Sequence, residues 1–231
     1  MEAKISEIFV SYQGEGPFAG SRQLFVRFYG CNLDCGYCDT VLESYRSFSK
    51  ETLLHRIMDF QEEYNELAIT GGEPLLSADF LKEFLPLFLR HHSRNIFLET
   101  NGTLPDELEK VVDYIDYVSM DFKLPSSSGS VLGHWNEHKA FIEILESKDK
   151  DLSVKAVVSN STTMDDIKKM KDLLNKVDKE FMVVLQPVTP VGESVKVPDE
   201  EMLFYFKEFL KKGTDKEVMI FGQIHKCLGI K

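Results

Sequence analysis

Three of the four cysteines in this 231-residue chain lie within one short segment, CNLDCGYC at 31–38. The thiolates of Cys31, Cys35 and Cys38 are soft ligands that suit zinc or an iron–sulfur cluster. A structural zinc site usually takes four protein ligands from paired segments, and the sequence offers one such segment. We therefore favour an iron–sulfur cluster with one iron that lacks a protein ligand and can bind a substrate or cofactor. Cys227, far away in the sequence, is expected to be an inert, buried thiol.

The composition limits the class of protein. The chain is 43% hydrophobic with a formal net charge of −11, which allows a substantial core over 1–231 as one domain and disfavours broad nucleic-acid binding. The sequence lacks an apolar run that could span a membrane, and MEAKISEIFV lacks the features of a signal peptide. We therefore expect a cytoplasmic protein without membrane association, whose reduced cysteines serve metal binding or redox catalysis.

Short strand-like segments alternate with amphipathic helical segments along the chain. Strands are expected at 23–30, 66–70, 95–100, 116–122, 152–159, 181–186 and 217–221. Helices are expected near 49–60, 78–91, 105–112, 137–148, from 162 or 163 onward, and near 198–211, with Pro86 as a potential break in the second. This α/β alternation predicts parallel strands, arranged as an open doubly wound sheet or an incomplete (βα) barrel.

Polar motifs follow these strands at the ends where both architectures carry their chemistry. They are TGGEP (70–74), ETNGT (99–103), DFKLPSSS (121–128), QPVTP (186–190) and GQIHK (222–226). Ordinary turn chemistry explains any one of them. The whole set beside a cysteine cluster predicts one functional site.

The C-x3-C-x2-C spacing, with an aromatic residue before the last cysteine, resembles the signature of the radical S-adenosylmethionine (SAM) superfamily. TGGEP resembles the glycine-rich element of that superfamily. The resemblance implies an incomplete TIM-type (βα)6 barrel with parallel strands, and a [4Fe–4S] cluster held by Cys31, Cys35 and Cys38. SAM would bind the fourth iron and be cleaved to methionine and a 5′-deoxyadenosyl radical.

The segment SYQGEGPFAGSRQLFVRFYGCNLDCGYCDT (11–40) resembles the 7-carboxy-7-deazaguanine synthase family, and the later motifs extend the resemblance over nearly the whole chain. It implies ring contraction of 6-carboxy-5,6,7,8-tetrahydropterin, with loss of ammonia, in queuosine and 7-deazapurine biosynthesis. It also implies Mg²⁺ bound by Thr40, for which a turn role is the alternative. A homodimer and a reductant such as flavodoxin or ferredoxin are further implied.

Arg27 belongs to a strand whose alternation puts Phe25, Arg27 and Tyr29 on one face. A buried guanidinium needs an anion: we favour the substrate carboxylate, and the alternatives are a glutamate in a structural pair or a position at the rim of the site. For Gln13, Gly14 and Glu15, the resemblance implies binding of the pterin edge, while the composition of QGEGP alone favours a glycine turn.

The remaining site residues rest on the resemblance. Thr70 and His225 are substrate candidates, although a lone histidine is more often structural. The implied SAM contacts are Tyr37, Cys38, Asp39, Gly72, Glu73, Asn101, Lys123 and Gln186. Two other functions compete: a radical SAM activating enzyme that makes a glycyl radical on a partner protein, and a non-catalytic iron–sulfur or zinc-binding protein.

Overall fold

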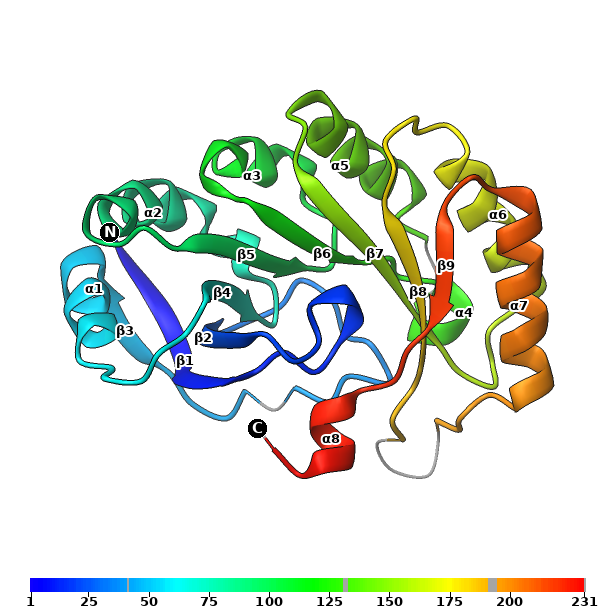
Figure 1. Ribbon diagram of the computed structural model, residues 1–231, viewed down its shortest axis with the longest axis horizontal. Coiled ribbons are helices and arrows are strands. Elements are labelled where there is room, and N and C mark those ends of the chain that lie inside the picture. The colour runs from blue at the N-terminus through cyan, green and yellow to red at the C-terminus, as the bar shows by residue number, and fades with distance from the viewer. Residues whose placement is uncertain (41, 131–132, 191–194, 231) are drawn as a thin grey trace.

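The computed structural model describes residues 1–40, 42–130, 133–190 and 195–230. Within these residues one sheet has the strand order β3-β1-β2-β4-β5-β6-β7-β8-β9. Figure 1 shows the sheet as a curved layer that carries most of the helices on its outer face. The strands are β1 (Glu2–Tyr12), β2 (Arg22–Phe28), β3 (Arg46–Ser49), β4 (Glu66–Gly71), β5 (Asn95–Thr100), β6 (Tyr117–Asp121), β7 (Asp151–Val158), β8 (Met182–Pro187) and β9 (Glu217–Ile220).

The strands from β2 to β9 pair in parallel, each with the next one along the chain once β3 is set aside. A doubly wound sheet reverses its strand order at a switch point, and this sheet does not reverse between β2 and β9. The two edge strands, β3 and β9, do not pair with each other in the described chain. The fold is therefore the incomplete barrel, as predicted, and not the doubly wound alternative.

The helices follow the strands much as the hydrophobic periodicity predicts. They are α1 (Lys50–Met58), α2 (Ala78–His91), α3 (Pro105–Glu109), α4 (Pro125–Ser128), α5 (Trp135–Ser147), α6 (Met164–Leu174), α7 (Glu200–Gly213) and α8 (Ile224–Leu228), with short 3-10 turns at Gly16–Phe18, Pro74–Ser77 and Val112–Tyr114. Side-chain oxygens of Ser49, Thr163 and Asp199 cap α1, α6 and α7 by accepting a backbone N–H of the first turn. None of the described helices is long and apolar enough to cross a membrane.

Two strands at the N-terminal edge were not expected. β1 pairs antiparallel with both β2 and β3, so the sheet is mixed and not wholly parallel. In the β1–β2 ladder Glu7 lies opposite Arg27. This pairing extends the barrel wall and brings an acidic side chain to the arginine predicted to need one.

The core lies between the sheet and the outer helices. On α2, Phe80, Phe84 and Phe88 are buried at four-residue spacing, and their rings contact one another in sequence at centroid distances of 5.8 and 6.1 Å. Pro86 does not break α2. It removes the hydrogen bond to the carbonyl of Lys82, and because Lys82 is exposed, water can replace that bond.

Candidate active site

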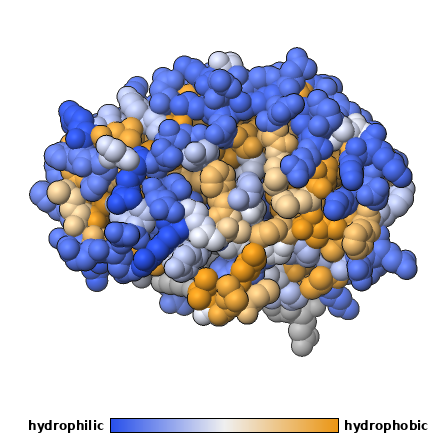
Figure 2. Space-filling model, viewed as in Figure 1, coloured by the Kyte–Doolittle hydropathy of each residue, from blue (hydrophilic) through white to orange (hydrophobic). Residues whose placement is uncertain are grey.

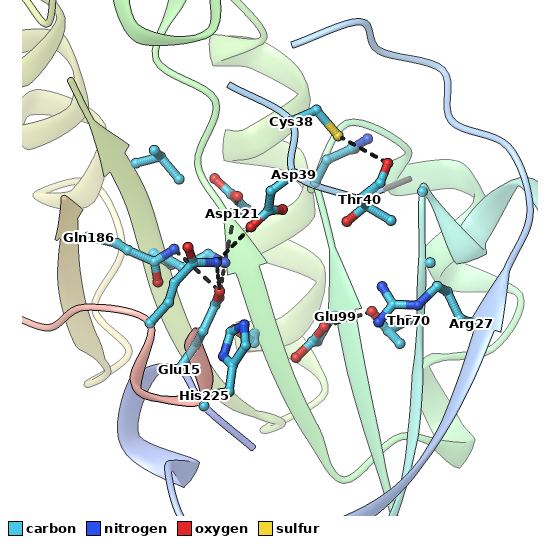
Figure 3. Close-up of a pocket in the computed structure, with 18 of the residues that line it drawn as sticks. Glu15, Arg27, Cys38, Asp39, Thr40, Thr70, Glu99, Asp121, Gln186 and His225 are labelled. Atoms are coloured by element: carbon cyan, nitrogen blue, oxygen red, sulfur yellow. Dashed lines mark hydrogen bonds and ion pairs between the residues drawn. The ribbon is translucent and has the colours of Figure 1, made fainter. Parts of the chain in front are cut away.

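A cavity of about 700 Å³ opens on the face of the sheet opposite the outer helices. Side chains from β1, β2 and β4 to β8 line it, together with the cysteine loop at 31–40 and the segment around α8. Figure 3 shows acidic, basic and amide side chains directed into this one space. Of the site residues predicted from sequence, all except Glu73 border it: Gln13, Gly14, Glu15, Arg27, Cys31, Cys35, Tyr37, Cys38, Asp39, Thr40, Thr70, Gly72, Asn101, Lys123, Gln186 and His225.

The three clustered thiols are free and border the cavity from the loop between β2 and β3. The loop is held by a hydrogen bond from the Cys38 N–H to the Cys35 carbonyl (2.9 Å) and by one from the Gly36 N–H to the carbonyl of Ser128 on α4 (2.9 Å). Among the described residues, no three His, Cys, Asp or Glu side chains lie close enough together to hold a single metal ion. Burial raises the pKa of the Cys31 and Cys35 thiols, so binding iron must release their protons.

Gly72, in the glycine-rich motif after β4, lies against the start of the cysteine loop. A Cβ at this position would be 2.2 Å from the Gly30 carbonyl oxygen and 3.0 Å from the Cys31 Cβ. Backbone atoms of the loop therefore fill the space that a side chain would need. The glycine is required by the packing of this chain, independently of any contact with SAM.

Glu73 lies behind the cavity wall, almost completely buried. Its carboxylate accepts hydrogen bonds from the backbone N–H groups of Leu75 (3.0 Å) and Asn101 (2.8 Å) and from the Thr100 hydroxyl (2.9 Å). Burial raises its pKa to about 7, although these hydrogen bonds act in the opposite direction. Glu73 ties the loop after β4 to the loop after β5 and so positions residues that do border the cavity.

Asn101 connects β5 to the cysteine loop. Its Nδ2 donates to Asn32 Oδ1 (2.9 Å) and lies 3.9 Å from Cys31 Sγ, while its Oδ1 accepts from the Thr103 hydroxyl (2.6 Å). Its carbonyl oxygen is 3.0 Å from Nε2 of His138. Burial lowers the pKa of His138 to about 4, so this histidine is a neutral hydrogen-bond donor that fixes the Asn101 backbone.

Lys123 and Asp121 form a buried ion pair of 2.8 Å at the end of β6. The ammonium also lies 3.5 Å from the Tyr37 hydroxyl and 5.3 Å from the centre of its ring. Burial alone would lower the pKa of Lys123, but the Asp121 carboxylate outweighs it and holds that pKa well above its usual range. Asp121 Oδ1 is buried and, among the described residues, lacks a hydrogen-bond partner. An acceptor is thus available at the cavity wall.

The QGEG segment is ordered by the side chain of Gln13. Its Oε1 accepts from the backbone N–H groups of Gly14 (2.9 Å) and Glu15 (3.1 Å), and its Nε2 donates to Glu99 Oε1 (2.7 Å). Glu99 Oε2 also accepts from the Thr70 hydroxyl (2.7 Å). Gln13 is therefore engaged in holding the turn, and Thr70 is engaged with Glu99.

Glu15 extends from this turn into the cavity. Its Oε2 forms an ion pair with Lys155 on β7. Its Oε1 accepts from Gln223 (2.6 Å) and, at the longer distance of 3.4 Å, from Gln186. The Oε1 of Gln186 is buried and has no partner within the described chain. Four segments far apart in the sequence meet at this carboxylate.

Arg27 donates from Nε to Glu7 Oε2 at 3.0 Å, and its guanidinium lies 5.6 Å from the centre of the Phe9 ring. The structural Arg–Glu pair that sequence reasoning left open is thus present. Nε is one of five N–H donors of a guanidinium, so the pair with Glu7 does not exclude a second anion. Phe25 and Arg27 border the cavity, whereas Val26 belongs to the core, as the alternation predicted.

The C-terminal segment closes one side of the cavity through α8, visible below the sheet in Figure 1. Asp39 pairs with Lys226 and accepts from Gln223 (3.0 Å). Beside it, Cys38 Sγ lies 3.9 Å from the carbonyl oxygen of Thr40. Figure 2 shows hydrophobic side chains gathered where Figure 1 has α8, including the exposed Leu228.

His225 packs on Gly14, where a Cβ would lie 2.0 Å from His225 Nδ1. The backbone supports this contact, because the Ile224 N–H donates to the Gly14 carbonyl (2.9 Å). Cys227 on the same helix is exposed, so the prediction of a buried thiol is wrong. The reason is that α8 is a short surface helix without a buried side chain.

Sequence reasoning named no role for several polar side chains of the cavity. Glu99, Asp121 and Gln223 lie in motifs that it placed at the site, whereas Glu7 and Lys155 lie outside them. Lys155 left the clearest signal, because it is a lysine inside the otherwise apolar run LSVKAVVS. A charged residue in a buried strand needs a partner. That signal predicts a functional or structural pair at this position without naming the partner.

Comparison with known proteins places these features in a family. Residues 25–174 match the model of the radical SAM superfamily. A 7-carboxy-7-deazaguanine synthase of Geobacter sulfurreducens is 33% identical, over 98% of this chain and 97% of the relative. Another of that name, from Methanothermobacter thermautotrophicus, is 32% identical over 100% and 99%.

Solved structures share the fold. QueE from Escherichia coli superimposes with a TM-score of 0.63 at 21% identity, over 95% of this chain and 94% of that one. A radical SAM methyltransferase from Sphaerobacter thermophilus gives 0.62 at 12% identity, over 93% and 77%. With the full-length relatives, these findings show that the chain belongs to the radical SAM superfamily and, within it, to the 7-carboxy-7-deazaguanine synthase family.

Proposed function

We propose that this protein is a lyase that converts 6-carboxy-5,6,7,8-tetrahydropterin to 7-carboxy-7-deazaguanine with loss of ammonia. The observation that carries the proposal is that the cysteine loop and the QGEG segment border the same cavity. A cofactor held by the first is thereby close to a substrate held by the second. The relatives named 7-carboxy-7-deazaguanine synthase, which align with nearly the whole chain, support the same reaction.

The residues at the cavity fit a [4Fe–4S] cluster and SAM. Cys31, Cys35 and Cys38 offer free thiols at the cavity, and the buried oxygens Asp121 Oδ1 and Gln186 Oε1 await donors, such as ribose hydroxyls or an amino group. When bound, the cluster and SAM supply a 5′-deoxyadenosyl radical that abstracts hydrogen from the substrate. The protein positions the substrate for that step.

On the cofactor side, each proposed SAM contact has its own task. Lys123, charged and in contact with Tyr37, suits a carboxylate or a ribose oxygen. Asn101 lies in the loop after β5 and contacts the cysteine loop through Asn32, where it can hold the methionine part of SAM. Tyr37, Cys38 and Asp39 would contact the adenine part, and Glu73 acts by fixing the backbone of Asn101.

On the substrate side, the proposed contacts are Gln13, Gly14, Glu15, Arg27, Thr70 and His225. Gln13 and Thr70 are tied to Glu99, so we assign them the task of shaping the pocket floor. Arg27 keeps guanidinium donors for the substrate carboxylate beside its pair with Glu7. Glu15 is a carboxylate that suits the N–H donors of a pterin edge.

We further propose that Mg²⁺ binds beside the substrate, with Thr40 as its protein ligand. Thr40 borders the cavity next to Cys38, and a hydroxyl together with substrate oxygens gives the hard-oxygen shell that Mg²⁺ prefers. The ion would orient the substrate carboxylate. Omitting Mg²⁺ from the assay is expected to lower turnover without preventing SAM binding.

Residues 1–231 are proposed to act as one radical SAM core domain, since a single sheet draws strands from both ends of the chain. The resemblance supports a homodimer, which light scattering of the purified protein would test. It also supports a reductant of the flavodoxin or ferredoxin type, which comparison of these donors in the turnover assay would test.

The decisive experiment is anaerobic reconstitution with iron and sulfide, followed by SAM, a reductant, Mg²⁺ and 6-carboxy-5,6,7,8-tetrahydropterin. Mass spectrometry is expected to find 7-carboxy-7-deazaguanine and ammonia. SAM cleavage without that product would indicate another radical SAM reaction. Failure to form an iron–sulfur chromophore would contradict the radical mechanism.

A further inference from the structure

Lys155 extends from β7 into the cavity between two carboxylates. Its Nζ forms an ion pair with Glu15 Oε2 and lies 3.8 Å from Asp121 Oδ2. Its side chain is 17% exposed. A buried ammonium is costly, and the proposed reaction as described above gives this one no task. We propose that Lys155 is a positioning residue that keeps Glu15 a carboxylate, and thereby makes the pocket select an N–H group of the substrate. This inference rests on the proposed function.

The surroundings of Glu15 show why Lys155 decides its charge. Among the described residues Lys155 is the sole cation in an ion pair with Glu15. The amides of Gln223 and Gln186 are neutral, and the nearby Asp121 is an anion that opposes the charge.

The other charged groups near this part of the cavity have partners of their own. Just after β6, Lys123 pairs with Asp121, the last residue of that strand. On α8, Lys226 pairs with Asp39. Glu99 on β5 is an anion that accepts from Gln13 and Thr70, and His225 on α8 packs on Gly14. Loss of the Lys155 ammonium would therefore leave Glu15 without a cation.

Two opposed effects set the protonation of Glu15. Burial pushes its pKa up, while the charge and hydrogen bond of Lys155, with the hydrogen bond of Gln223, outweigh burial and bring that pKa below its usual value. Without the ammonium, burial and the Asp121 charge would remain, and both favour the neutral acid. The variant would then titrate at a higher pH than the natural protein.

The charge of Glu15 decides which ligand group it can face. A carboxylate is acceptor-only, with about four lone-pair positions. Lys155, Gln223 and Gln186 occupy three, which leaves one for a ligand. That position takes an N–H or O–H donor. A protonated Glu15 would meet that donor as a neutral acid, and the hydrogen bond would lose the strength that a charged acceptor gives it, which weakens binding.

The charge itself can be tested in the reconstituted holoenzyme without turnover. Infrared titration follows the C=O stretch of protonated carboxyl groups in the natural protein, Lys155→Met, Lys155→Arg and Lys155→Met/Glu15→Gln. Glu73, whose pKa burial raises to about 7, contributes one such band to every variant. A further band that titrates at higher pH is expected in Lys155→Met, absent from the double variant and from Lys155→Arg. Lys176→Met, at an exposed lysine, is the matched control. If Lys155→Met shows no such further band, the proposal is wrong.

Binding is tested by the pH profile of KM for the pterin. In Lys155→Met, KM is expected to rise about 10- to 100-fold where Glu15 is neutral, and to fall as the pH rises through the new pKa. Lys155→Arg is expected to restore the flat profile. Glu15→Gln alone should raise KM similarly, and adding Lys155→Met should raise it no further.

Two results of these kinetics overturn the inference. One is an unchanged KM in Glu15→Gln, and the other is a pH-independent loss in Lys155→Met that Lys155→Arg shares. If the natural protein does not convert the pterin at all, the proposed function fails, while the infrared titration still decides the role of Lys155.

Discussion

Substituting Gly72 by alanine tests whether this glycine serves packing or SAM binding. The added Cβ would lie 2.2 Å from the Gly30 carbonyl oxygen and 3.0 Å from the Cys31 Cβ. Both neighbours belong to the segment that carries the first cysteine of the cluster. The backbone is rigid at this point, because the Gly72 N–H donates to the Phe28 carbonyl (3.2 Å) and the Glu73 N–H donates to the Gly30 carbonyl (2.8 Å).

The size of the effect follows from this geometry. Ordinary van der Waals contact of a Cβ begins at 3.4 Å, so the Gly30 oxygen must move by 3.4 − 2.2 = 1.2 Å. Overpacking of a close-packed region costs about 1–3 kcal/mol. For a chain of this length that corresponds to a lowering of Tm by about 2–4 °C per kcal/mol. The displacement passes directly to Cys31, so cluster assembly should suffer beyond the loss of stability.

The assay compares Gly72→Ala with Gly36→Ala, a glycine of the cysteine loop itself. A Cβ at Gly36 meets only the Ser128 carbonyl, at the ordinary distance of 3.8 Å. The Tm, measured in the absence of SAM, is expected to fall in Gly72→Ala and to stay unchanged in Gly36→Ala. The same result is expected for the iron content after reconstitution. If Gly72→Ala keeps the Tm and the iron content of the natural protein and loses only affinity for SAM, the packing argument is refuted and direct contact with SAM is favoured.

Three further changes test other parts of the site. Cys31→Ala should abolish the iron–sulfur absorption after reconstitution, whereas Cys227→Ala, at an exposed thiol, should retain it. Burial raises the pKa of the Glu73 carboxyl from 4.5 to about 7, so the folded protein binds this proton more tightly than the unfolded chain does. The resulting contribution of Glu73 to the free energy of unfolding is fully present below pH 4.5 and is lost as the pH rises through 7. Urea unfolding should show a loss of about 3 kcal/mol over that interval in the natural protein relative to Glu73→Gln; equal pH slopes would contradict the buried-acid argument. Asp166 accepts hydrogen bonds from the N–H (2.8 Å) and the hydroxyl (2.5 Å) of Ser126 on α4, so Asp166→Ala should lower the free energy of unfolding by about 1–3 kcal/mol. It should also lower the iron content, because α4 supports the cysteine loop through the Ser128 carbonyl. If Asp166→Ala binds as much iron as the natural protein, the cysteine loop does not need this support.

The parallel core of the fold could be predicted because its signals are local. The α2 pattern, with phenylalanines four residues apart, and the strand 66–70 are each visible within a short window. β1 escaped prediction although it is the longest strand, since its sequence EAKISEIFVSY mixes polar residues on both faces. It is stabilised by pairing with β2 and β3, which only the tertiary structure brings together.

The missed strand limited what could be said about the site. The alternation on β2 predicted that Arg27 shares a face with Phe25 and Tyr29, but its partner Glu7 lies on β1, so the choice between a glutamate and a ligand stayed open. Likewise Lys155 meets Glu15 across 140 residues, and Gln223 meets it across 208. Residue types at strand ends predict which groups gather. They do not predict which group pairs with which.

The pairings matter because they balance charge inside the cavity. Glu15, Lys155, Asp121 and Lys123 alternate in sign along one chain of contacts, so these four groups together are formally neutral although the protein carries −11. A buried charge is tolerated only with a partner, and a substrate carboxylate adds one more anion beside two ammonium groups that already pair with Glu15 and Asp121. It must therefore arrive with a cation or find one outside this chain of contacts. Arg27, with guanidinium donors beyond Nε, and the proposed Mg²⁺ at Thr40 are the cations that the proposed function offers, and Figure 3 shows Arg27 and Thr40 across the cavity from Glu15. The proposed function therefore assigns the N–H groups of the substrate to Glu15 and its carboxylate to Arg27 and Mg²⁺.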